Sequence, residues 1–449
     1  MYVLIYWTEE DGEDITIGFE EYHEIKNLSF APEVDLIGAS VPINEFSAEI
    51  VTSTMDKIKV GHWCELYDDD DNKWASYWLT YAERVDAKTV KVIAKSPLCT
   101  LDYVNMPETV YENADASTVI ISCIEAGGEF GPGAISIDSS FTNATINGYC
   151  PPETARERLT AVLFAIGAYA KSCFSDTVDI LPIDATETQI PIEDTYWKPT
   201  VTFKDWVTAL KVTAYTFTRA ESEQAWANDP NSLSFPYPWV ATTQEFTLQN
   251  PSVPSGTPEN IVYIDGVYLI NTSNVSSIMT IMSQRYFKRI ELDADVINNG
   301  TYAPGDRVIV YADEETLYSG YIESAGFVFG LQARSAIKLT ACESRAGAKL
   351  IVNYIWSGDG RRLGRHVYYL PVGYPYTIQT LYLDKNIEGH RYIFRPTTET
   401  ISGTLTSAGA TVTVSCEVAL DLYKGVLHVI SVDEITTVTE DGQTIGVIS

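Results

Sequence analysis

The sequence predicts an α+β, β-rich fold: two related small β-barrels with α/β insertions between them and a C-terminal small β domain. Three observations support this class. Apolar and polar residues alternate in most segments, an amphipathic helix stands near the middle of the chain, and one hairpin pattern occurs twice. The 449 residues exceed what one hydrophobic core usually serves, so we expect several domains. The predicted domains are the N-terminal strands with the first barrel (1–100), the α/β insertion region (101–285), the second barrel (286–345) and the C-terminal β domain (346–449).

Residues 1–100 carry the alternation of half-buried strands. The stretches "ITIGFEEY" and "FSAEIVTS" are typical of strands, and Pro32 and Pro42 lie between them. The strand "TVKVIAKS" (89–96) closes this unit, and "AIKLTACES" (336–344) is its counterpart later in the chain. The repeat therefore covers two or three strands on each side.

The repeated hairpin is "GHWCELYDDDDNKWASYWLT" (61–80), which aligns without a gap on "GDRVIVYADEETLYSGYIES" (305–324). Apolar Cys64 and Leu66 match Val308 and Val310, and an acidic turn follows in both stretches. Period-2 alternation fixes which side chains face inward, so we expect the two hairpins to superpose as the cores of two similar barrels. The structural repeat positions are the four identities, Gly61 with Gly305, Tyr67 with Tyr311, Asp69 with Asp313, and Tyr77 with Tyr321.

Helical signals lie between the two hairpins. "PPETARERLTAVLFAIGAYAKS" (151–172) begins with two prolines, and its apolar residues recur at a period near 3.6, so we expect an amphipathic helix ending near Lys171. Shorter helices are predicted at 116–128 and 274–287, and a strand at 176–183. Residues 200–218 are interpreted as strand, helix and strand, and polar loops follow at 228–239 and 250–260. After Arg345, the stretches "HVYYLPV", "RYIFRP", "TVTVSCEVAL" and "GVLHVISV" predict a separate β domain.

The net charge of −31 excludes a groove that grips phosphate, because so acidic a surface repels nucleic acid. A plain solvated acidic surface is the alternative interpretation. No stretch reaches membrane-spanning length, and the N-terminal "MYVLIYW" lacks the features of a signal peptide. We therefore expect a soluble product made in a cytoplasm.

Motifs for catalysis or cofactor binding are weak. The seven cysteines are scattered and never spaced as CxxC, so we expect buried thiols and neither disulfides nor zinc. His62 and Cys64 alone make a poor metal site, and the run Asp68 to Asp71 lacks calcium-loop spacing. The stretch "GDGRRLGR" (358–365) does not follow a strand and open a helix, as a phosphate loop would. We predict no catalytic residue, no metal and no cofactor.

Two small barrels separated by α/β insertions resemble the baseplate hub proteins of phage tails and contractile injection systems, also called late control or tail-associated proteins. "TINGYCPPETARERLTAVLFAIGAYAKSC" (145–173) is similar to the insert helix of that family. "NVSSIMTIMSQRYFKRIELDADV" and the hairpin that follows it resemble the segment that opens the family's second barrel. The resemblance covers roughly residues 40–345. The family's lysozyme-like or peptidase-like extensions have no counterpart within these 449 residues, which argues against a cell-wall-cutting role.

The resemblance implies a homotrimer that adapts a six-fold tail tube to a three-fold tip, because two barrels in each of three chains give six near-equivalent barrels. The implied partners are the tail tube or distal tail protein ring, a tail spike or tip protein, and the tape measure protein. DNA would pass through an acidic channel without specific binding, in a virion tail assembled in the bacterial cytoplasm. The alternatives are a distal tail adaptor and a receptor- or carbohydrate-binding tail protein. A glycoside hydrolase would need a close pair of carboxylates in a cleft.

Overall fold

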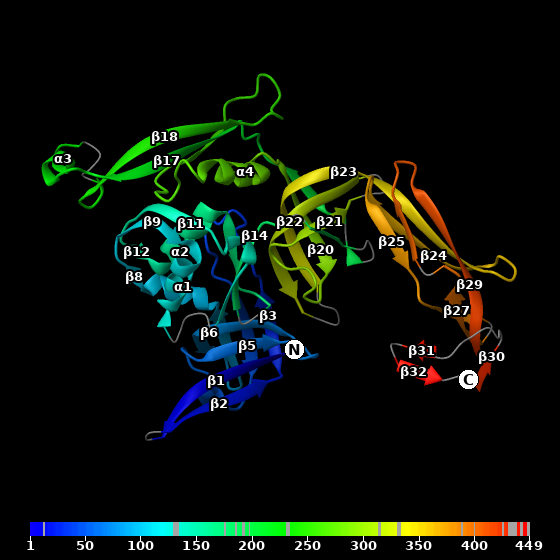
Figure 1. Cartoon of the computed structure of the whole chain (residues 1–449). Helices are drawn as coiled ribbons and strands as arrows, with labels where there is room; N and C mark the ends of the chain where they lie inside the picture. The colour runs from blue at the N-terminus through cyan, green and yellow to red at the C-terminus, as the bar shows by residue number, and fades with distance from the viewer. Residues whose placement is uncertain are drawn as a thin grey trace. The chain divides into compact units, whose positions relative to one another are not determined.

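The structure is a computed structural model dominated by β-strands, and the predicted α+β, β-rich class is confirmed (Figure 1). The chain divides into two compact units. The first comprises Met1–Ile309 and Ser319–Glu343, and the second comprises Val310–Tyr318 and Ser344–Ser449. The structure describes residues 1–11, 14–128, 134–174, 177–184, 186–190, 194–196, 198–229, 234–312, 316–329, 334–387, 389–398, 400–423, 426–429, 438–440 and 443–446.

The first seven strands form one continuous set of hydrogen-bonded neighbours. Their pairings join them in the order β2–β1–β5–β6–β7–β4–β3, all antiparallel. The strands are β1 (Tyr2–Asp11), β2 (Asp14–Tyr22), β3 (Ile25–Phe30), β4 (Glu45–Val51), β5 (Trp63–Tyr67), β6 (Lys73–Arg84) and β7 (Thr89–Lys95), with the short 3-10 helix η1 (Met55–Lys57) between β4 and β5. We refer to this set as the first strand set.

The order of the first strand set begins with β2 and ends with β3, which are consecutive in the chain with only His23 and Glu24 between them. In β1, β4 and β7 alternate side chains are buried, as period-2 strands around one core require. The buried side chains include Val3, Ile5, Phe30, Phe46, Ala48, Ile50, Cys64, Leu66, Tyr77, Leu79, Val90, Val92 and Ala94. The described pairings contain no closed ring, so the predicted barrel stays a prediction.

The insertion that follows contains two helices packed on each other. Their core holds Val119, Ile120, Leu159, Val162 and Leu163. The elements are η2 (Pro97–Tyr103), β8 (Asn105–Met106), β9 (Thr109–Asp115), α1 (Ala116–Glu125), β10 (Ala134–Ile137), η4 (Ser139–Phe141), β11 (Thr145–Cys150), β12 (Glu153–Thr154), α2 (Ala155–Ile166), β13 (Ala168–Lys171) and β14 (Thr177–Pro182). The small sheets pair β9 with β11, β8 with β12, and β14 with both β10 and β13.

The predicted helix over 151–172 is shorter than expected. Thr154 is its N-cap, and a reciprocal capping box with Glu157 fixes the start of α2 after the prolines. Gly167 ends the helix with φ +73°, a left-handed conformation that glycine adopts without steric cost. The residues beyond it then form β13, so the expectation that the helix ends near Lys171 is wrong.

A long hairpin replaces the helix predicted within 200–218. β17 (Ala209–Arg219) pairs along its whole length with β18 (Trp239–Gln249), and its other edge pairs in parallel with β19 (Ile261–Ile264). Alternate β17 residues Leu210, Val212 and Ala214 pack against α4 (Val275–Tyr286), so the residues favour a strand with one buried face. The short helix α3 (Glu223–Asn228) lies between β17 and β18. Part of the loop predicted at 228–239 lies outside the described residues.

A second strand set follows the same plan as the first. β16 (Thr200–Phe203) pairs with β20 (Ile290–Ile297), β20 with β23 (Arg334–Trp356), and β21 (Arg307–Tyr311) in parallel with β15 (Glu187–Gln189). β22 (Thr316–Val328) follows β21, and a methyl group at Gly320 would meet β23 at Thr340 and Cys342. Its order is therefore β16–β20–β23–β22–β21–β15.

The second unit contains a β-sheet built on the C-terminal part of β23. There β23 lies between β24, which is antiparallel to it, and β29, which is parallel; β27 then pairs with β29 and with β26. Val352, Phe394 and Val414 are in its core. The remaining strands are β24 (Arg362–Pro371), β25 (Pro375–Gln379), β26 (Leu383–Ile387), β27 (His390–Pro396), β28 (Thr400–Thr404), β29 (Ala410–Tyr423), β30 (Val426–Val429), β31 (Val438–Glu440) and β32 (Gln443–Gly446). The predicted four-part domain division stays a prediction.

Candidate functional site

The first repeated hairpin is β5–β6, and its turn is closed by Asp68. The Asp68 carboxylate accepts hydrogen bonds from the backbone N–H groups of Asp70 and Asn72 at 2.9 and 2.8 Å. It also accepts bonds from the side chains of Asn72 and Trp74 at 3.0 and 3.2 Å. Burial alone would raise the pKa of Asp68, but these hydrogen bonds lower it below its ordinary value. The run of aspartates is therefore a turn that its own first residue stabilises.

Hydrogen bonds of the two hairpins fall at matching positions. At the turn, Asp68 N–H donates to Asn72 O, and Ala312 N–H donates to Thr316 O, both at 3.1 Å. At the base, Gly61 N–H donates to Leu79 O at 2.8 Å, and Gly305 N–H donates to Ile322 O at the same distance. Gly61 and Gly305 have φ angles of +92° and +98°, where a side chain is strained. Gly61 is exposed, whereas Gly305 is buried against Tyr169.

The two hairpins differ by a β-bulge, which adds one residue to the second strand of the first hairpin. The pairing of β5 with β6 shifts register between Leu66 and Tyr67, so β6 holds one extra residue at Trp74. Tyr77 consequently pairs with Cys64 and packs in the core against Phe46. Tyr321 instead lies under the Arg307 guanidinium and clusters with Val34, Leu36 and Tyr169. The two tyrosines, matched by the ungapped alignment, lie on opposite faces of their strand sets.

The other repeat positions have different neighbours in the two hairpins. Tyr67 is half-buried, stacks on Tyr2 and donates to Glu65; burial and that bond raise its pKa to about 12. Tyr311 is buried and packs against Tyr369. Asp69 is 89% exposed and pairs with the N-terminal amine. Asp313 lies outside the described residues, so its correspondence with Asp69 stays a prediction.

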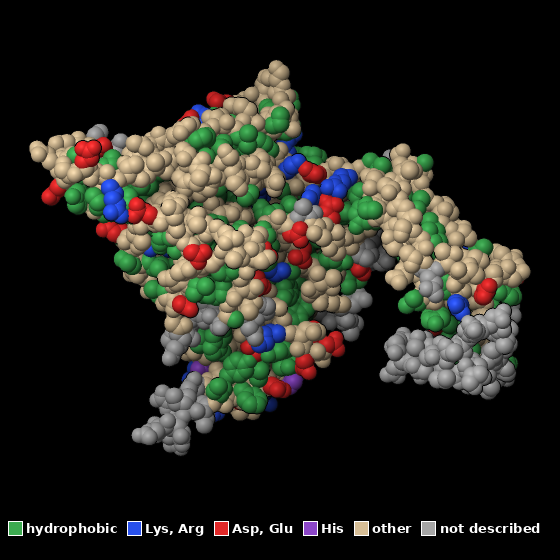
Figure 2. Space-filling model, viewed as in Figure 1, with side chains coloured by type: hydrophobic (Ala, Val, Ile, Leu, Met, Phe, Trp, Pro, Cys, Tyr) green, Lys and Arg blue, Asp and Glu red, His purple; other side chains and the backbone are tan. Residues whose placement is uncertain are grey.

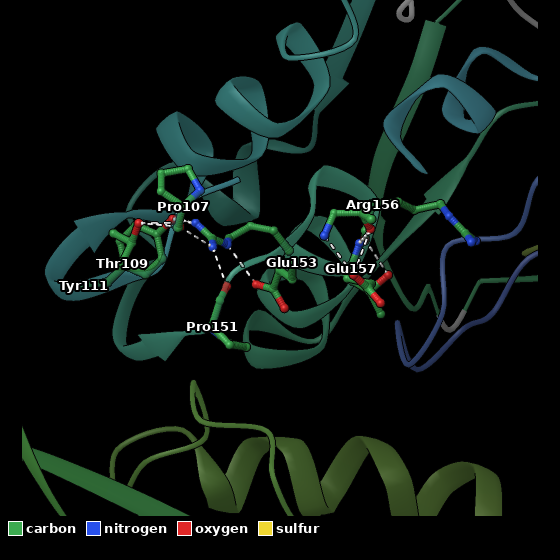
Figure 3. Close-up of polar contacts among 10 residues, drawn as sticks. Pro107, Thr109, Tyr111, Pro151, Glu153, Arg156 and Glu157 are labelled. Atoms are coloured by element: carbon green, nitrogen blue, oxygen red, sulfur yellow. Dashed lines mark hydrogen bonds and ion pairs between the residues drawn. The ribbon is translucent and has the colours of Figure 1, made fainter. Parts of the chain in front are cut away.

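A polar cluster surrounds Arg158, which is 1% exposed on the buried face of α2; its partners Pro107, Pro151 and Glu153 are labelled in Figure 3. Its guanidinium donates to Glu153 at 2.8 Å and to the carbonyls of Pro107 and Pro151 at 2.8 and 2.9 Å. Thr109 and Tyr111 hydroxyls lie at 3.4 and 3.3 Å. Desolvation would lower the pKa of Arg158, but the bond to Glu153 reverses this and raises it.

The Arg158 cluster joins α2 and the residues just before it to a loop about 50 residues earlier in the chain. It ties the loop before β9 and the Pro151–Glu153 entry of α2 to the helix itself (Figure 3). Beside it, Arg156 pairs with Asp102 of η2 at 2.6 Å and donates to the Val41 carbonyl. These contacts fix the helix against η2 and the connection between β3 and β4. A buried, fully bonded arginine of this kind holds a scaffold in place rather than a substrate.

Comparison with known proteins gives one informative result. No protein-family model matches the sequence, and no curated protein resembles it significantly. Among solved structures, the tail protein from Neisseria meningitidis MC58 is similar with a TM-score of 0.50 and 10% identity, over 76% of this chain and 96% of that one. The chain has a tail-protein fold. The predicted resemblance to phage tail proteins is confirmed at the level of the fold.

Two further structures with lower TM-scores are also similar. The 43 kDa tail protein of prophage MuSo2 from Shewanella oneidensis has a TM-score of 0.48 and 10% identity, over 75% of this chain and 98% of that one. The E. coli c3393 protein is described as a type VI secretion component with structural similarity to the T4 tail proteins gp27 and gp5. Its TM-score is 0.40 with 8% identity, over 88% of this chain and 99% of that one. Of these three proteins, the Neisseria one has the highest TM-score, and the fold is assigned from it.

The chemistry available on this tail-protein fold is limited. Among the described residues, no group of three or more His, Cys, Asp or Glu side chains could hold a metal ion. The Cys64 thiol faces the core of the first strand set, where burial raises its pKa far above the ordinary value and keeps it protonated. Among the described helices, none combines the length and apolar character needed to cross a membrane.

Sequence reasoning missed Arg158, although a signal for it exists. Arg158 lies four residues before Val162 and beside Leu159, on the apolar stripe of the predicted helix. A charged residue on such a stripe is almost never fully buried unless it is paired. The pattern therefore predicts a carboxylate nearby, and Glu153 at the helix entry is the available one.

Proposed function

We propose that this protein is a structural component of a phage-type tail, acting as the hub at the baseplate or tail tip. Three copies form a ring that contacts the tail tube or distal tail protein ring on one side and a spike or tip protein on the other. The tape measure protein is a further partner. The chain performs no catalysis, and its place of action is the virion tail.

The observation that carries this proposal is the strand order that occurs twice in one chain. In each set, the strand before the hairpin pairs with the strand that closes it: β4 with β7, and β20 with β23. Two similar units per chain let three chains present six similar surfaces, which resolves the mismatch between a three-fold tip and a six-fold tube. The tail-protein fold supports the same interpretation.

The acidity of the chain fits a conduit for DNA. Each chain carries a net charge of −31, and an acidic wall repels phosphates, whereas a basic one would release counterions and hold them. Screening limits this repulsion to about 8 Å at physiological salt, so the carboxylates must lie on the channel wall itself. The purified protein should therefore leave duplex DNA unretarded in a gel-shift assay at low salt, where electrostatic binding is strongest.

The test of the hub is the mass of the recombinant protein in solution. Light scattering coupled to size exclusion should give three times the chain mass of 49.8 kDa, alone or together with a tail partner. A monodisperse monomer at high concentration, which no tail-tube or tip protein brings into a trimer, contradicts the proposal. Retention of DNA contradicts only the conduit.

A further inference from the structure

The outer wall of the first strand set carries a row of aromatic side chains that directly oppose one another across four strands. Phe19 on β2 pairs with Tyr6 on β1, Tyr6 pairs with Trp63 on β5, and Trp63 pairs with Trp78 on β6. The Trp63 and Trp78 rings lie 4.0 Å apart. We call Phe19, Tyr6, Trp63 and Trp78 the aromatic row.

The exposed end of the aromatic row lies on β2. Phe19 is 64% exposed, and Ile17, two residues before it on the same face, is 75% exposed. Glu21 continues that face and is itself about half exposed. Figure 2 shows hydrophobic side chains gathered over β1 and β5 with acidic ones beside them. Trp78, at the other end of the row, is 8% exposed, so the accessible patch consists of Ile17 and Phe19 beside a carboxylate, a combination that interfaces use.

The second strand set has a different surface at the corresponding place. There Glu187 on β15 pairs with Arg307 on β21, with 3.1 Å between the charged groups. The Arg307 guanidinium also covers the Tyr321 ring at 5.4 Å, and its Nε donates to the Ser319 hydroxyl at 3.2 Å. Ser319 and Tyr321 are 0% and 9% exposed, so this place is covered within the chain and is not open to a partner.

The difference between the two surfaces limits what can cover the aromatic row. A six-fold partner would contact both strand sets in the same way, so its docking surfaces should be alike in the two. The aromatic row is present in only one of them. The aromatic row therefore suits a contact that each chain makes once. In a ring of identical chains, the junction between neighbouring chains is such a contact.

A complementary surface is present beyond the end of β16. A groove of about 520 Å³ is lined there by Phe203, Trp206, Phe287 and Arg289, among other residues. Phe203 is 62% exposed, and the Arg289 guanidinium lies 4.4 Å from the centre of the Trp206 ring. Arg289 Nε donates to the Lys204 carbonyl, and no described carboxylate pairs with this guanidinium.

From this complementarity we propose that the aromatic row of one copy docks, through Ile17 and Phe19, into the Phe203–Trp206–Arg289 groove of a second copy. The apolar side chains enter an aromatic groove, and Glu21 meets the Arg289 cation. Within one chain the two surfaces do not cover each other, because Phe19 and Phe203 are both exposed. A head-to-tail contact of this kind generates a closed ring when its rotation is three-fold. The inference rests on the proposed ring and names the contact that closes it.

Cross-linking of the intact chain tests this contact. Phe19→Cys chains mixed with Phe203→Cys chains should form a disulfide-linked dimer under mild oxidation, whereas either variant alone should not. The native cysteines give a low background, since among the described residues six are buried and Cys99 is partly so. A disulfide formed by Phe19→Cys alone shows that the row pairs with itself and overturns the head-to-tail contact.

Assembly strength gives the second readout. Phe19→Asp and Phe203→Asp should each raise the concentration at which half of the chains assemble by roughly tenfold or more, as loss of an interface anchor does. The control is Tyr103→Asp, since Tyr103 is 86% exposed but lies in the insertion, and it should leave assembly unchanged. A trimer that forms normally in both Asp variants overturns this contact and leaves the hub standing. A wild-type chain that stays monomeric even in the presence of tail-tube and tip proteins overturns both.

Discussion

The two strand sets share an order but fill their interiors differently. On the facing strands of the first set, Phe46 pairs with Ala94, and both are fully buried. At the same place in the second set, Leu292 pairs with Leu339. The first set thus has a large residue opposite a small one, where the second set has two leucines. The two pairs contain the same number of side-chain carbon atoms but differ in shape and volume, so the shared strand order does not depend on one particular packing.

The largest effect is expected from emptying one of these positions. Phe46→Ala should destabilise the protein by about 3–5 kcal/mol, because it removes a buried ring and leaves a cavity. The double variant Phe46→Leu with Ala94→Leu imports the pair of the second set and keeps the number of side-chain carbon atoms. Because two leucines occupy more volume than phenylalanine with alanine, it should cost about 1–3 kcal/mol, less than Phe46→Ala. Urea unfolding measures both. A double variant as unstable as Phe46→Ala would show that the two interiors are not equivalent.

The next largest loss of stability is expected from replacing the base glycines Gly61 and Gly305. The two share a positive φ but differ in the space around them, so their variants distinguish backbone strain from steric overlap. Gly61→Ala adds only backbone strain of about 1–3 kcal/mol, because nothing lies within 4 Å of the new methyl group. Gly305→Ala has the same strain, and its methyl group also overlaps the Tyr169 hydroxyl, which adds about 1–3 kcal/mol. Thermal unfolding of the two variants should rank Gly305→Ala as the less stable. Equal losses would contradict this account of their surroundings.

The stability of the first hairpin turn should depend on pH, because Asp68 titrates. The second hairpin has Ala312 at the position that matches Asp68, so its turn has no such dependence. Asp68→Ala should cost about 1–2 kcal/mol at neutral pH through lost hydrogen bonds to a carboxylate. The folded-state pKa of Asp68 lies below its ordinary value of 3.8, so its contribution is complete above that value and disappears as the pH falls through the folded pKa. The stability difference between wild type and variant, followed by urea unfolding from pH 7 to pH 3, should therefore shrink only at the acidic end. Asp68→Asn serves as the control that keeps the shape.

The smallest effect is expected at the repeat position Asp69. Its pairing with the N-terminal amine is exposed, so Asp69→Ala should change stability by less than about 0.5 kcal/mol. Calorimetry at low and high salt provides the measurement. A larger loss would mean that Asp69 has a structural role that its exposure does not suggest.

The sequence was sufficient where the determinants are local. The existence of α2 follows from its apolar period near 3.6, although the capping box of Thr154 and Glu157 places its start after the two prolines, and the inward side chains of β5 follow from Cys64 and Leu66. The paired hairpins could be found because their turns and base glycines have the same spacing. These features depend on neighbours in the chain, which the sequence displays directly.

Other features depend on distant residues and were not predictable in this way. β17 was predicted to include a helix, and it is a strand because β18 and β19 pair with its two edges. The bulge near Trp74 reverses the face of Tyr77, and no turn residue marks it in the sequence. The network of Arg158 joins carbonyls of two prolines, and backbone carbonyls carry no sequence signal.

The Arg158 cluster has a consequence for how the insertion opens. A helix of 12 residues is marginal by itself, and the guanidinium is fully bonded only when the loop at Pro107, the entry at Pro151 and α2 are all in place. Opening any one of these segments would leave the buried guanidinium without its partners. The free energy of opening one segment alone is therefore high. Amide hydrogen exchange should therefore show α2, β8 and β12 exchanging together, as one cooperative unit with a single opening free energy.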